Sequence, residues 1–198
     1  GKIAKAQAKV IKADQRSCTV TPDFGYVGAD AINAAAIAGE LGLVGDVFGS
    51  DLNAALLDVE DDKIIAKCQA GVAKDYEKVL SAQLRTFVRC KQDGLKSGQI
   101  RSGAGIAACF DDVAADPKGT IAKGLAKVAK RMTNKWRPIS VLIVAFPGQC
   151  MGASDASDFA GCIGDLADCR ACQMLNAFDG LSEDCDAFDD GTLNASCQ

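Results

Sequence analysis

A twelve-residue segment occurs twice in this chain, and this internal repeat restricts the fold more than any other feature of the sequence. Residues 1–12 and 119–130 agree at eight of twelve positions. In the second copy, lysines form one stripe, and apolar residues recur with helical spacing at Ile121, Leu125, Val128 and Met132. The repeat predicts an all-α helical repeat or bundle in which two unequal copies of a unit bury their apolar faces against neighbouring helices.

The first copy carries the same lysine stripe, at Lys5, Lys9 and Lys12. It opens the chain, whereas Asp116 and Pro117 lead into the second copy and are suited to begin a helix. We expect the first helix, which lacks this lead-in, to complete a unit of a neighbouring molecule. The three lysines are therefore candidate self-association residues.

Ten cysteines among 198 residues indicate a disulfide-stapled protein. Because disulfides persist outside the reducing cytosol, we expect export to the extracellular space or the cell surface, with a cytosolic zinc protein as the alternative. The even count allows five bridges, although sequence does not give the pairing. The candidate half-cystines are Cys18, Cys68, Cys90, Cys109, Cys150, Cys162, Cys169, Cys172, Cys185 and Cys197.

Two of these residues, Cys169 and Cys172, form a CxxC motif. A thioredoxin-like site would place this motif at a helix start within a βαβ pattern, and the sequence shows no such pattern. Structural disulfides are therefore favoured over redox activity. A cysteine-only zinc site is a further alternative, although only the CxxC pair has typical ligand spacing among its candidates Cys162, Cys169, Cys172 and Cys185.

The chain contains no histidine. This absence excludes Ser-His-Asp and Cys-His catalysis, His-ligated zinc and the usual axial ligation of haem. No pair of carboxylates stands out as a hydrolytic site, so a carboxylate-based hydrolase is a minor alternative. We expect a protein that is not an enzyme and that needs no cofactor, with calcium as the one candidate ion.

Charge is distributed unevenly along the chain. Residues 61–150 carry sixteen basic and eight acidic side chains, whereas residues 151–198 carry one basic and ten acidic. Such polarity suits head-to-tail contact between copies, or between the halves of one chain. The lysine stripes lack interleaved aromatic residues, so we expect no nucleic-acid partner.

The calcium candidate is a cluster of carboxylates that precedes Gly191. Calcium favours such hard oxygen ligands, but the spacing misses the EF-hand register and lacks its closing Glu. A solvated acidic loop is the simpler interpretation. The candidate ligands are Asp184, Asp186, Asp189 and Asp190.

Helical spacing extends along most of the chain. We expect an alanine-rich helix over residues 29–43, broken by glycines beyond it, and a long helix from Asp61 to about Gly94. Cys68 and Cys90 share a face of the long helix about six turns apart. They cannot reach each other, so each is expected to pair with another element and to pin one end of the helix.

The β-branched stretch from Ser140 to Phe146 predicts either a strand, which another subunit would have to pair, or a buried helical turn. This longest apolar run is too short to cross a bilayer, so we expect no membrane span. We expect a partial helical repeat over residues 1–60. A second repeat over residues 61–198 would end in a loop-rich, acidic, cysteine-rich cap, as a separate unit or as part of one continuous domain.

The motif Cys162-x6-Cys169-x2-Cys172-x2-Leu175-Asn176-x2-Asp179-Gly180-Leu181 and the following Asp184-Cys185-Asp186 resemble cysteine-rich helical repeats of exported bacterial proteins of unassigned function. The resemblance implies secretion and disulfides, and it carries no catalytic residues. Trp136, which stands where the first copy has Cys18, departs from the pattern. Together with the charge polarity, these features predict a self-associating subunit of an extracellular or cell-surface filament or layer. An extracellular calcium- or ligand-binding module is the alternative.

Overall fold

A computed structural model describes residues 1–133 and 138–197 of the chain. Every regular element in these residues is helical, which confirms the all-α prediction. The helices are α1 (Lys2–Ser17), α2 (Ala29–Phe48), α3 (Leu52–Ala55), α4 (Lys63–Ser97), α5 (Gly103–Ala107), α6 (Cys109–Ala115), α7 (Thr120–Met132), α8 (Ile139–Ile143), the 3₁₀ turn η1 (Gln149–Gly152), α9 (Ala156–Asp179) and α10 (Cys185–Asp189).

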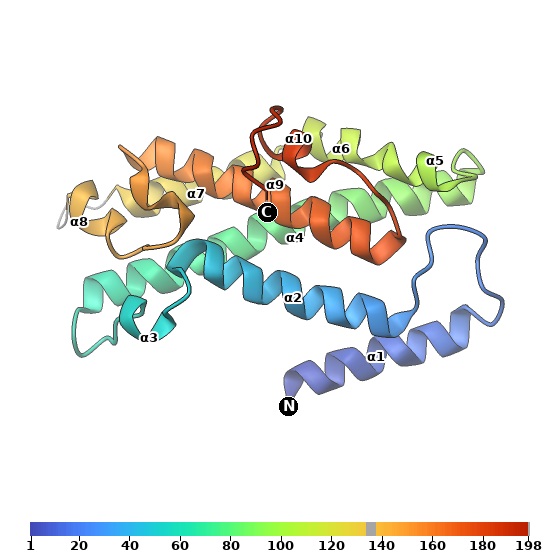
Figure 1. Cartoon of the computed structure of the whole chain (residues 1–198), viewed down its shortest axis with the longest axis horizontal. Helices are drawn as coiled ribbons and strands as arrows, with labels where there is room; N and C mark the ends of the chain where they lie inside the picture. Colours follow the sequence, from blue (N-terminus) through green and yellow to red (C-terminus); the bar gives the residue numbers. More distant parts are fainter. Residues whose placement is uncertain (134–137, 198) are drawn as a thin grey trace.

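Three helices, α4, α7 and α9, pack against one another and form the centre of the molecule. Helix α2 packs on α9, and α1 lies at the edge of the molecule against α2 (Figure 1). The central helices meet through side chains that are fully buried, among them Tyr76 and Phe87 of α4, Val128 of α7 and Phe159 of α9. Burial of this apolar surface provides most of the driving force for folding.

Helix α4 is the longest element and matches the helix expected from Asp61. The carboxylate of Asp62 accepts hydrogen bonds from the backbone N–H groups of Ile64 and Ile65, at 2.9 and 3.1 Å, and so caps the first turn. At the other end Gly98 takes a left-handed conformation, with φ of 73°, and ends the helix.

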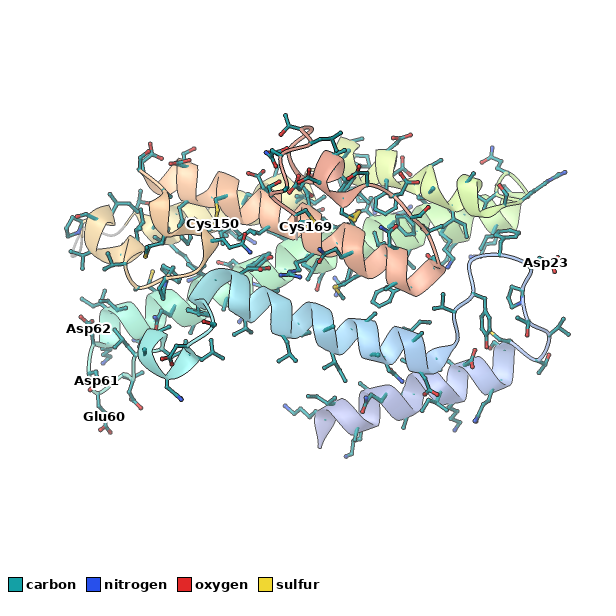
Figure 2. The ribbon with its side chains drawn as sticks, viewed as in Figure 1. Asp23, Glu60, Asp61, Asp62, Cys150 and Cys169 are labelled. Carbon is teal, nitrogen blue, oxygen red and sulfur yellow. A yellow bond between two sulfur atoms is a disulfide. The ribbon has the colours of Figure 1, made fainter. Side chains whose placement is uncertain are left out.

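Four disulfides join eight of the ten cysteines: Cys90–Cys109, Cys150–Cys162, Cys169–Cys197 and Cys172–Cys185. Figure 2 labels Cys150 and Cys169, which belong to two of these bridges. The expectation of five bridges is not met, because Cys18 and Cys68 are unpaired. Helix α4 is therefore crosslinked only near its C-terminal end. The buried thiol of Cys68 lies 4.0 Å from the backbone oxygen of Arg131 instead of near another cysteine.

The stretch from Ser140 to Phe146 is not a strand. Residues 139–143 form α8, and Leu142, Ile143 and Phe146 are buried in the core, so the buried helical turn is the correct alternative. Its β-branched composition is explained by burial, since a short apolar run does not distinguish a strand from a buried helix. Trp136 lies outside the described residues.

The two copies of the repeat are both helical but pack differently, so the structure does not show two copies of one unit. Helix α7 lies between α4 and α9 and buries Ile121, Val128 and Met132. Helix α1 buries no residue, and its Ile3 is 67% exposed. The less exposed positions of α1 include Gln7 and Asp14, where the second copy has Leu125 and Met132. Asp14 accepts a hydrogen bond from the hydroxyl of Tyr26, which lies in the loop before α2.

A buried polar cluster joins α2 to the central helices. The carboxylate of Asp46, 2% exposed, accepts hydrogen bonds from Nε and Nη2 of Arg170, both at 2.7 Å. It also accepts from Gln149 at 3.0 Å and from the hydroxyl of Tyr76 at 3.2 Å. Of the glycines expected to break this helix, Gly42 and Gly45 lie within α2, and Gly49 ends it. A Cβ at Gly42 would lie 2.7 Å from Cζ of Arg170, so the glycine makes room for this side chain.

Candidate functional site

A groove runs between α4 and α7 and extends to the α5–α6 segment. Its volume is about 1340 Å³. Small residues line part of it, including Ser81, Ala82, Ala108 and Gly124. Helices α4 and α7 approach closely at Gly124, where a Cβ would lie 2.6 Å from Cγ2 of Val79. This close approach explains why the second copy has glycine where the first has alanine.

Six basic side chains line the groove, against four acidic ones. Two of the cations are paired, since Lys78 lies 2.9 Å from Asp75 and Arg89 lies 3.7 Å from Asp93. The other four have no acidic partner within the described part of the chain: Arg85, Lys118, Lys123 and Lys127. The groove is therefore a site of positive potential with cations on both flanking helices.

The acidic cap comprises α9, α10 and the segment up to residue 197. Its only basic residue, Arg170, is directed inward to Asp46. Burial and the nearby Asp190 and Asp189 raise the pKa of Asp165. Burial, Asp165 and Asp189 raise the pKa of Asp168 to about 7. The cap therefore carries an excess of negative charge, although its Asp179 is paired with Lys91.

The four calcium candidates mostly serve as hydrogen-bond acceptors within the cap. Asp184 caps α10. Asp186 accepts from the backbone N–H of Ala195, and this bond, with its neighbours, lowers the pKa of Asp186. Hydrogen bonds from Thr192 likewise lower the pKa of Asp190. Only Asp186 and Asp189 share a partner, the hydroxyl of Ser196, at 3.2 and 2.7 Å.

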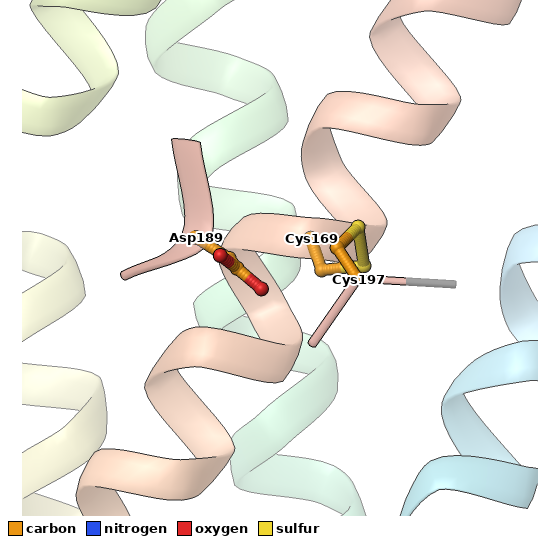
Figure 3. A group of neighbouring side chains, drawn as sticks. All are labelled: Cys169, Asp189 and Cys197. Atoms are coloured by element: carbon orange, nitrogen blue, oxygen red, sulfur yellow. A yellow bond between two sulfur atoms is a disulfide. The ribbon is translucent and has the colours of Figure 1, made fainter. Parts of the chain in front are cut away.

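One group of three potential metal ligands occurs in residues 1–133 and 138–197, and it consists of Cys169, Asp189 and Cys197 (Figure 3). The two sulfur atoms are bonded to each other, so neither is a thiolate ligand. The zinc candidates are likewise disulfide-bonded, in three separate bridges, and the structure brings no four-thiolate site together in these residues. Calcium binding at the predicted carboxylates stays a prediction.

The groove and the acidic cap are formed by different elements. Among the described residues, none of α9 or α10 lines the groove, although α9 contacts both α4 and α7. The cap reaches the neighbouring α6, because Phe188 of α10 packs on Phe110 with ring centroids 5.1 Å apart. The basic groove and the acidic cap are therefore separate surfaces of one chain.

The predicted self-association residues Lys5, Lys9 and Lys12 are exposed on α1, and no acidic side chain pairs with them in the described residues. Their role stays a prediction. Sequence reasoning identified the matching lysines of α7 but not the groove. The missing information was that α4 and α7 lie side by side.

Comparison of the chain with protein-family models, curated proteins and solved structures finds no match. The comparisons therefore identify no family, and what is confirmed is the coarser description of a helical, cysteine-rich chain with four disulfides.

Within the described residues, α2 is the one helix long and apolar enough to span a membrane, with a mean hydropathy of 1.4. A buried helix of a soluble protein and a signal sequence pass the same test. In this structure α2 packs on α9 and contributes the buried Asp46 to the core. The expectation that the chain has no membrane span stays a prediction.

Proposed function

We propose that this protein is an exported structural subunit that associates with copies of itself at the cell surface or in the extracellular space. The observation that carries the proposal is that one chain carries a basic groove and an acidic cap as separate surfaces formed by different elements. Two surfaces of opposite charge favour contact between the groove of one copy and the cap of the next.

Such a contact is heterologous, because it joins two different patches. Heterologous contacts leave an unused patch at each end of an assembly, so they add further copies until a ring closes or a filament forms. The proposed product is therefore an open filament or a ring, which is the form that a structural role requires.

Export is supported by the four disulfides, since such bonds persist in oxidising compartments. Disulfides also suit a subunit that must endure outside the cell, where no chaperone refolds it. The paired cysteines lie within residues 90–197, and three of the four bridges include a cysteine of α9 in the acidic cap.

Self-association is tested by size-exclusion chromatography with light scattering, at salt concentrations of about 0.05 and 0.5 M, on the purified disulfide-intact chain. We expect species larger than the 20.5 kDa subunit at low salt and a shift towards monomer at high salt, because screening weakens contacts between exposed charges. Negative-stain electron microscopy of the low-salt sample distinguishes rings from filaments. A monomer under every condition and concentration contradicts the proposal.

A further inference from the structure

We infer that the groove between α4 and α7 receives the acidic cap of a second copy of this chain. This inference rests on the proposed self-association and names the two surfaces that meet. It places a specific binding site on α7, the second copy of the repeat, and not on the exposed first copy α1.

The first argument is that both the groove and the acidic cap carry charged side chains that lack an ion-pair partner in the described residues. Arg85, Lys123 and Lys127 line the groove and make no ion pair within the described residues. On the cap, Asp165 and Glu183 have no cationic partner in the same residues. Asp165 lies close enough to Asp189 and Asp190 for these carboxylates, together with burial, to raise its pKa, and such a crowded acid gains from a nearby cation.

The second argument is shape and order. Lining residues on α4 extend from Asp75 to Gly94, which spans about 28 Å at about 1.5 Å per residue. This length accommodates a folded segment rather than one side chain. The cap is already ordered by the bridges Cys169–Cys197 and Cys172–Cys185, so docking costs little conformational entropy.

The third argument is the arrangement within one chain. The described groove lining contains no residue of α9 or α10, so the chain's own cap does not occupy its own groove. A second copy supplies a complementary acidic cap for this groove, and it also carries a groove of its own that can receive the cap of a third copy.

The test uses two variants that each remove one half of the contact. The groove variant carries Lys123→Glu and Lys127→Glu, and the cap variant carries Asp165→Lys and Glu183→Lys. All four side chains are exposed, and none makes a side-chain hydrogen bond or ion pair in the described residues, so circular dichroism and melting should match the parent protein. Each variant alone is expected to self-associate at least about tenfold more weakly than the parent.

Mixing the two variants should restore association, because the groove variant keeps its cap, the cap variant keeps its groove, and the reversed groove and reversed cap are again opposite in charge. The expected product contains both variants in a 1:1 ratio and is larger than the 20.5 kDa subunit, whereas each variant alone associates weakly. A contact between identical patches would give no such rescue.

The repeat offers a matched control for the groove. Lys5 and Lys9 occupy in α1 the positions of Lys123 and Lys127 in α7, so Lys5→Glu with Lys9→Glu makes the same charge change outside the groove. A matched control for the cap is Glu60→Lys with Asp61→Lys, two exposed acidic residues at the tip of the α3–α4 connection (Figure 2). Both controls should associate like the parent protein.

The outcomes separate this inference from the proposed function. Self-association that survives in the groove variant, or is lost instead in the α1 control, overturns the groove–cap contact and leaves the proposed function standing. A parent protein that stays monomeric overturns both. Retention of a monomeric parent on immobilised dextran sulfate, lost in the groove variant, would assign the groove to a soluble polyanion and overturn the second-copy contact.

Discussion

Replacement of Asp46 by alanine should lower the free energy of unfolding by about 4 kcal/mol. The carboxylate is 2% exposed and accepts hydrogen bonds from Arg170, Gln149 and Tyr76. Its removal leaves the guanidinium group of Arg170 without its carboxylate partner and leaves the fully buried hydroxyl of Tyr76 without an acceptor. Breaking a buried ion pair costs about 3–5 kcal/mol, and an orphaned buried hydroxyl costs about 1–3 kcal/mol.

We take the lower part of the combined range because the Arg170 side chain is 20% exposed and also hydrogen-bonds Gln173 at 2.9 Å. For a chain of this size, 4 kcal/mol corresponds to a fall in melting temperature of about 10 °C. Loss of the cluster should loosen α2 from α9 first, since Asp46 and Arg170 belong to these helices.

The assay is guanidinium unfolding with disulfides intact, followed by circular dichroism at 222 nm, in a double-mutant cycle of Asp46→Ala and Arg170→Met. The double variant should be more stable than the sum of the two single effects by at least about 2 kcal/mol, because neither charge is then left unpaired. Additive effects, or a loss below about 1 kcal/mol for Asp46→Ala, would refute this account of the cluster.

Three further predictions concern other parts of the fold. Replacing Cys90 and Cys109 together by serine should cost about 3 kcal/mol, measured by guanidinium unfolding, because the bridge closes a loop with a sequence separation of 19 residues. Gly148→Ala should destabilise the protein by more than about 2 kcal/mol, since a Cβ there would lie 2.0 Å from the backbone oxygen of Asp46. The control Gly161→Ala, at a helical position with open space, should be neutral or stabilising. Equal melting temperatures for the two variants would contradict this prediction. The pKa of Asp168, about 7, exceeds the value of about 3.9 in the unfolded chain, so the folded state binds more protons between these pH values. The free energy of unfolding should therefore fall as pH rises from about 4 to 7. Urea unfolding at several pH values should show that Asp168→Asn removes most of this dependence on pH.

Helical periodicity predicted the elements whose inward face is apolar. The long helix α4 and the second repeat copy α7 were found in this way, because Tyr76, Phe87 and Val128 follow the helical period and become buried. The same logic failed for α1. Gln7 and Asp14 stand at its inward positions, so sequence identity on the lysine stripe did not bring equivalent packing.

Long-range relations could not be predicted. Whether Cys68 finds a partner depends on which helix lies opposite it, and that neighbour is the backbone of Arg131. The apolar run at Leu142 and Ile143 was ambiguous because burial selects the same residues in a strand and in a core helix. The groove depends on α4 lying beside α7, a contact between segments separated by a loop and two short helices.

The position of the disulfides gives the chain an uneven response to tension. All four bridges lie within residues 90–197, whereas the cysteines of residues 1–89 are unpaired. Pulled from its N-terminus, the chain could release residues 1–89 to a contour length of about 300 Å, at roughly 3.4 Å per residue. The bridged loops beyond Cys90 cannot extend while their sulfur–sulfur bonds hold. Each molecule thus combines a freely extensible N-terminal segment with later loops whose length is fixed by disulfides.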